Sequence, residues 1–189
     1  SLLLIGFLTA FTVSKSHYYE PSFNPRIICN LTSDKMIYKI GELPKFKVEI
    51  SNNTKNEIYL IGSLDGSDAK WRFPHCYFEM DKETRPVGRC GNMNGIGLED
   101  FRLIKPGQKF DPYDGFFSDL SITDLENFNT LGIYKIRFYY STNSSNFKDY
   151  EGDQVNSINY SDSLKIISVF HKVPKVELQS NQIEIRFEK

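Results

Sequence analysis

The side chains best suited to chemistry lie in one central segment, residues 62–98, which contains the chain's only tryptophan. Binding patches favour Trp, Tyr and Arg, and here such residues stand beside Gly- and Asn-rich stretches. The segment therefore predicts a recognition surface. The candidate binding residues are Trp71, Arg72, Arg89, Asn92 and Asn94. The alternative is structural: Trp71 and Phe73 pack into the core, and Arg72 covers them.

The same segment holds two of the three cysteines, which are Cys29, Cys76 and Cys90. A disulfide between Cys76 and Cys90 would close a loop of about 15 residues and contribute about 3 kcal/mol in an oxidising compartment. Cys29 would then remain a buried thiol on a strand. Pairing of Cys29 with either of the others stays open, because sequence does not fix connectivity.

Two metal sites can be considered. Asp65 and Asp68 offer hard oxygen ligands for calcium, but the further acids of an EF-hand-like loop are missing, and ordinary Asp-Gly turns explain the pattern as well. His75, Cys76 and Cys90 offer zinc ligands, but their spacing does not match that of structural zinc sites. We expect no cofactor, with calcium as the alternative.

Nucleophilic catalysis would pair Cys76 or Cys90 with one of the three histidines, His17, His75 and His171. A working site needs a base within hydrogen-bond reach of the nucleophile. His75 and Cys76 are neighbours on a predicted strand, so their side chains should point to opposite faces. The sequence therefore predicts a protein that is not an enzyme.

Short apolar or alternating segments separated by turn residues follow one another from residue 24 onward. Strict alternation, as in residues 46–50, is typical of a strand with one buried face. The predicted strands are residues 27–31, 35–38, 46–50, 57–61, 76–80, 100–104, 133–140, 164–170 and 182–187. The best helical candidate is one turn at 121–128, and 62–75, 85–98 and 141–162 read as long loops. Many short strands with Gly- and Pro-containing turns indicate an all-β fold.

Two motifs resemble secreted bacterial immunoglobulin-like domains: Pro106-Gly107 followed by Gly132-Ile133-Tyr134, and Ser180-Asn181 leading into the last strand. The resemblance implies an immunoglobulin-like antiparallel β-sandwich with long inserted loops. It also implies that Tyr134 lies at a corner, with its hydroxyl bonded to upstream backbone. It implies no activity, because such sandwiches serve many unrelated roles.

The first sixteen residues differ from the rest, since residues 2–13 form an apolar run. It is too short for a transmembrane helix and suits the core of a signal peptide; a buried strand or an anchor helix is the alternative. We expect residues 1–16 to be a leader and 17–189 to be one elaborated domain. The product should be secreted or periplasmic and not attached to a membrane after leader removal.

The charge of the chain bears on which classes of partner it could bind. The formal net charge is −1 and basic residues are spread, whereas nucleic-acid binders usually show a basic stripe. We therefore expect no nucleic-acid partner. The predicted function is a non-enzymatic binding or accessory module with a protein or glycan partner. A secreted protease inhibitor or hydrolase on the same scaffold is the alternative.

Overall fold

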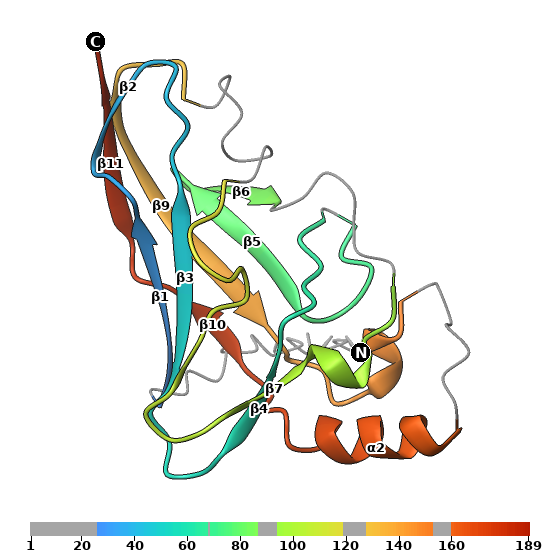
Figure 1. Cartoon of the computed structure of the whole chain (residues 1–189). Coiled ribbons are helices and arrows are strands. Elements are labelled where there is room, and N and C mark those ends of the chain that lie inside the picture. Colours follow the sequence, from blue (N-terminus) through green and yellow to red (C-terminus); the bar gives the residue numbers. More distant parts are fainter. Residues whose placement is uncertain (1–25, 68, 87–93, 119–127, 153–159) are drawn as a thin grey trace, which may run out of the picture.

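The protein is built mainly from strands, and the all-β prediction is confirmed (Figure 1). The computed structural model describes residues 26–67, 69–86, 94–118, 128–152 and 160–189. The strands are β1 (Ile27–Ser33), β2 (Ile37–Lys39), β3 (Phe46–Asn52), β4 (Ile58–Ile61), β5 (His75–Met80), β6 (Glu83–Pro86), β7 (Phe101–Ile104), β8 (Lys109–Phe110), β9 (Gly132–Ser141), β10 (Glu177–Gln179) and β11 (Ile183–Glu188). The helical elements are α2 (Tyr160–Phe170) and the 3₁₀ turns η1 (Leu98–Asp100) and η2 (Phe147–Tyr150).

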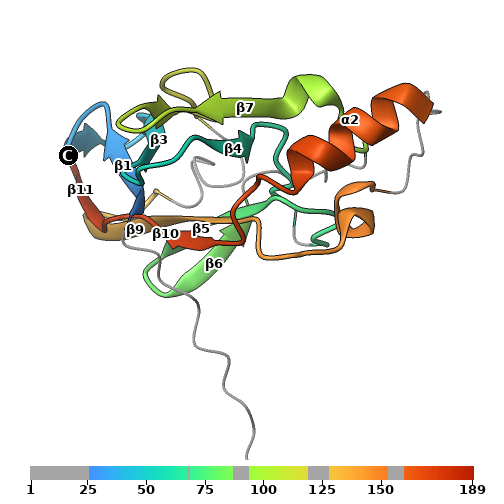
Figure 2. The same ribbon diagram turned by 90° about the horizontal axis from the view of Figure 1, so that it is seen from below.

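The strands form two layers that face each other (Figure 2). One layer is a six-stranded sheet of order β2-β11-β9-β5-β6, in which β10 also pairs with β9. The other contains the sheet β1-β3-β8 and the pair β4-β7. Among the named strands of the described residues, every pairing is antiparallel except that of β2 with β11. β10 and β11 pair with the same edge of β9, one after the other. The short chain between them therefore interrupts the pairing along that edge.

The main core lies between the layers and follows from the alternation of the strands. Phe46, at the start of β3, is fully buried, whereas the next residue is only partly buried. The ring centroid of Phe46 lies 5.5 Å from that of Phe78 in the opposite layer, and that of Phe138 lies 5.0 Å from Phe78. The buried aromatic side chains of the two layers therefore interlock.

The prediction of a strand at residues 164–170 is wrong, because this segment belongs to helix α2. Ile166 and Phe170, four residues apart, are both buried, whereas Leu164 and Ile167 are exposed. This spacing places the buried pair on one helical face. The face packs on a second apolar cluster that includes Ile61. The helix candidate at 121–128 lies, apart from Phe128, outside the described residues.

A tyrosine holds the start of β9 in the way that the resemblance implies. The hydroxyl of Tyr134 donates to the carbonyl of Thr130 at 3.0 Å and lies 2.8 Å from the Thr130 hydroxyl. Gly132, two residues earlier, has φ +148°, a conformation that favours glycine. The Gly-x-Tyr motif thus fixes a corner where the chain enters β9.

Lys175 lies against aromatic rings beside the second cluster. Its Nζ is 3.7 Å from the ring centroid of Phe170 and 5.5 Å from that of Tyr150, and it is buried without a hydrogen-bond partner. Desolvation lowers the pKa of Lys175 from 10.5 to about 8. Holding the charge there therefore costs stability at neutral pH.

We expect Lys175→Met to stabilise the fold by about 1 kcal/mol at pH 7, a figure reduced because the residue as a whole is partly exposed. The folded pKa lies below the unfolded value, so the folded chain binds fewer protons between about pH 8 and 10.5. The contribution of Lys175 to wild-type stability should become more favourable with pH across this window, and the advantage of the variant over the wild type should fall toward zero. Urea unfolding of both proteins at pH 7, 9 and 10.5 measures this difference. An advantage that is absent at pH 7, or that grows with pH, would contradict it.

Candidate functional site

A groove of about 800 Å³ runs beside β1 and β10 and extends over the outer faces of β5 and β9. Its floor contains buried apolar side chains, which are Ile27, Cys29, Tyr140 and Leu178. Its rim carries polar side chains, which are Asn30, Glu177, Gln179 and Asn181. An apolar floor with a polar rim is the usual composition of a ligand site.

The edge of β1 that does not pair with β3 is open over part of its length. Asn53 donates to the carbonyl of Arg26 at 2.6 Å, so Arg26 and every second residue after it face β3. The backbone groups of Ile27, Cys29 and Leu31 point to the opposite edge. Within the described parts of the chain, those of Ile27 and Cys29 have no hydrogen-bond partner.

Asn181 occupies the same edge of β1 at Leu31. Its Oδ1 accepts from the Leu31 amide at 2.9 Å, and its Nδ2 donates to the Leu31 carbonyl at 3.1 Å. One side-chain amide therefore satisfies both backbone groups, as a residue on a neighbouring strand would. The open part of the edge begins just beyond this contact.

The loop before β5 contributes Lys70 and Phe73 to the groove, and His75 at the start of β5 lies beside them. Buried polar contacts fix this loop. Asp65 accepts backbone hydrogen bonds from Ser67 at 3.0 Å and from Arg72 at 3.2 Å. The two carboxylate oxygens of Asp65 thus organise the loop, as is common for aspartate in turns. This is a structural role for a residue that the sequence offered as a calcium ligand.

The sequence offered an arrangement in which Trp71 packs into the core and Arg72 covers it. The structure has the reverse, with Arg72 buried and Trp71 exposed. Arg72 is only 1% exposed, whereas Trp71 is 48% exposed. The guanidinium of Arg72 donates to the carbonyls of Ser63 and Phe73 at 2.9 and 3.0 Å, and to the Ser63 hydroxyl at 2.6 Å. Burial lowers the pKa of Arg72, and Asp100 and Asp65 oppose that shift. The buried arginine thus ties the loop together and leaves Trp71 facing outward.

Two tyrosines form the wall of the groove on the outer sheet face. The rings of Tyr77 and Tyr139 stack with centroids 4.5 Å apart and an interplanar angle of 13°. Lys70 Nζ lies 5.6 Å from the Tyr77 centroid. The Tyr139 hydroxyl donates to Glu79 at 3.0 Å. The Tyr77 ring therefore already has Tyr139 and Lys70 as close neighbours.

His75 and Cys76 lie on opposite faces of β5, as predicted. Cys76 is buried, with its Sγ 3.6 Å from the Tyr113 hydroxyl, whereas His75 packs against Phe73 with ring centroids 4.0 Å apart. Desolvation lowers the pKa of His75. His171 follows helix α2 and is exposed, and it is not among the residues that line the groove.

Cys29 lies on strand β1 as a buried thiol, as the sequence predicts. Its side chain is buried in the core, and burial raises the pKa of the thiol to about 12. Such a thiol is unreactive at neutral pH. Cys76 is likewise present as a buried thiol, so the predicted Cys76–Cys90 disulfide is not supported. Cys90 itself lies outside the described residues.

Several predicted site residues cannot be placed. Asp68, Arg89 and Asn92 lie outside the described residues, as does His17. Asn94 is described and exposed, but it does not line the groove.

In the described ranges, no group of three or more His, Cys, Asp or Glu residues could hold a metal ion. The described helices include none that is long and apolar enough to cross a membrane.

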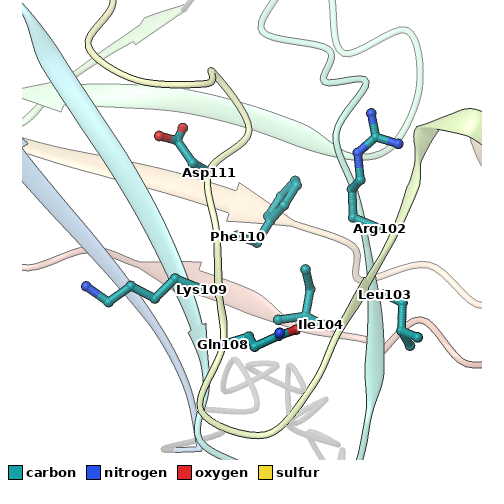
Figure 3. A pocket seen from close by; sticks show the side chains of 7 residues that line it. All are labelled: Arg102, Leu103, Ile104, Gln108, Lys109, Phe110 and Asp111. Carbon is teal, nitrogen blue, oxygen red and sulfur yellow. The ribbon is translucent and has the colours of Figure 1, made fainter.

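A second, shallower depression of about 400 Å³ lies between β7 and β8 (Figure 3). Ile104 and Phe110 lie between the two strands, while Leu103 and Lys109 extend away on opposite sides. The depression is more open than the first groove and has charged residues at its margin, including Arg102 and Asp111. It provides a second open strand edge against which the first can be compared.

Comparison with known proteins adds no family to this picture. No protein-family model matches the chain, and no curated protein is significantly similar to it. Sequence reasoning found the loop with Trp71 and Arg72, but it missed the groove beside β1. In the sequence, the Ser180-Asn181 pair indicates only the start of the last strand.

Proposed function

We propose that the chain is a non-enzymatic binding module with an immunoglobulin-like sandwich that takes up an extended segment of a partner protein at the open edge of β1. The observation that carries the proposal is the run of unpaired backbone groups at Ile27 and Cys29 beside an apolar floor. Strand addition uses such an edge for affinity and adjoining pockets for alternate side chains. Two facing sheets and the Tyr134 corner support the scaffold. Export of the protein remains part of the proposal.

A glycan partner is the less favoured alternative. Sugar rings bind proteins by stacking on aromatic faces, but the stacked pair Tyr77–Tyr139 uses one face of each ring, and Lys70 lies over Tyr77. Within the described residues, the backbone edge at Ile27 and Cys29 has no such internal partner. A protease inhibitor would present a loop around 85–94, most of which lies outside the described residues.

The proposal is tested by selecting peptides from a random dodecapeptide library displayed on phage. A selected peptide should lose about tenfold in affinity when N-methylated at residues that face β1, because each loses a backbone hydrogen bond. N-methylation of the intervening residues should have little effect, which gives a period of two. A glycan array run in parallel tests the alternative partner.

The binding edge is located by amide hydrogen exchange with and without the peptide. The amides of Ile27 and Cys29 should exchange about tenfold more slowly in the complex. The control is Leu103, whose backbone faces the open edge of β7, and its exchange should not change. Failure to select any peptide, an N-methyl pattern without the period, or protection at Leu103 alone would overturn the proposal.

A further inference from the structure

The backbone at Asn181 is held by hydrogen bonds between its neighbour Ser180 and strand β9, while its side chain contacts the edge of β1 in the other layer. The neighbouring Ser180 is buried and donates its amide to the Phe138 carbonyl at 2.9 Å. The Ser180 hydroxyl accepts from the Phe138 amide at 2.9 Å and donates to the Asn181 carbonyl at 2.7 Å. These bonds attach the chain at Asn181 to β9, so the Asn181 side chain spans from one layer to β1 in the other.

The contact between Asn181 and Leu31 lies at one end of the open part of the β1 edge. On this edge of β1, the backbone groups of Leu31 are hydrogen-bonded to the Asn181 side chain. Within the described residues, the backbone groups of the next two edge residues, Cys29 and Ile27, have no hydrogen-bond partner. An added strand that pairs with Cys29 and Ile27 would therefore meet the Asn181 amide where its next pair should form. Edge residues alternate along the strand, so each further pair requires two more ligand residues.

We propose that Asn181 is a positioning residue that sets the register and length of the bound segment by blocking its pairing at Leu31. This inference rests on the proposed function and names a determinant of specificity within that site. A ligand of fixed short length would then bind in one register, although a strand edge alone permits sliding by two residues. The bound segment ends at the Asn181 amide.

The test compares the selected peptide with versions lengthened by two residues at either end. Against the wild-type chain, the extension that runs toward Leu31 should not improve affinity. Against Asn181→Ala, the same extension should improve it by about tenfold, because a new backbone pair forms at Leu31. Asn181→Asp is the matched control: it keeps an acceptor for the Leu31 amide, so the extension should bring little gain.

Hydrogen exchange at Leu31 separates register control from a purely structural bridge. In Asn181→Ala the Leu31 amide should exchange rapidly, become protected by the extended peptide and stay unprotected with the short one. Asn181→Ser serves the same purpose if the alanine variant does not fold. If the short peptide binds with its period of two but no variant responds to length, this inference fails and the proposed function stands. If no peptide binds, both fail.

Discussion

Arg72→Ala is expected to lower the free energy of unfolding by about 3 kcal/mol. The substitution removes a buried guanidinium that donates to the carbonyls of Ser63 and Phe73. These partly buried carbonyls would lose a charged donor and keep part of the cost of desolvation without the bond. The loop that lines the groove should loosen as well, which limited proteolysis can detect. Urea unfolding gives the free-energy change directly.

The neighbouring residue supplies the control for this prediction. Trp71 is 48% exposed on the same loop, so Trp71→Ala should change the free energy of unfolding by less than about 1 kcal/mol, the usual range for surface positions. A stability of Arg72→Ala close to that of Trp71→Ala would show that the guanidinium does not hold the loop. Arg72→Met would then separate lost packing from lost hydrogen bonds.

Phe138→Ala should be still more damaging, with a loss of about 4 kcal/mol. Phe138 is 0% exposed at the centre of β9 and contacts Phe78 with ring centroids 5.0 Å apart. Removing the ring leaves a cavity between the two layers. The surrounding side chains are closely packed, so they relax only partly into that space. Thermal and urea unfolding should both report the loss.

The matched control lies on the same strand. Ile133 is 49% exposed on β9, so Ile133→Ala removes a side chain of similar type without opening a cavity. We expect a loss of less than about 1 kcal/mol. Equal effects of the two substitutions would mean that the space between the layers does not form the main core.

The strands were predictable where alternation was strong. β3, β5, β9 and β11 lie within a residue or two of the ranges expected from the sequence, because one buried face imposes a period of two. The segment 164–170 misled because its β-branched residues favour strands. Its helical burial is set by the second apolar cluster, which is assembled from distant parts of the chain.

The candidate site could be predicted only in part. Aromatic and basic side chains drew attention to the loop near Trp71, but which of them is buried depends on carbonyls such as that of Ser63, nine residues away from Arg72. The groove depends on contacts over still longer separations. Leu31 and Asn181 are 150 residues apart, and no local pattern shows which strand edge such a pair will leave open.

These long separations have a consequence for how the molecule forms. Strand β2 pairs with β11 between Ile37 and Arg186, so both the sheet's outer pairing and the bridge from Asn181 join opposite ends of the chain. Closing loops of this size costs entropy before any contact repays it. We therefore expect slow folding, on the scale of milliseconds to seconds, in which these terminal pairings form last. The Asn181 contact with Leu31, which bounds the proposed binding edge of β1, would then be among the last parts of the fold to form.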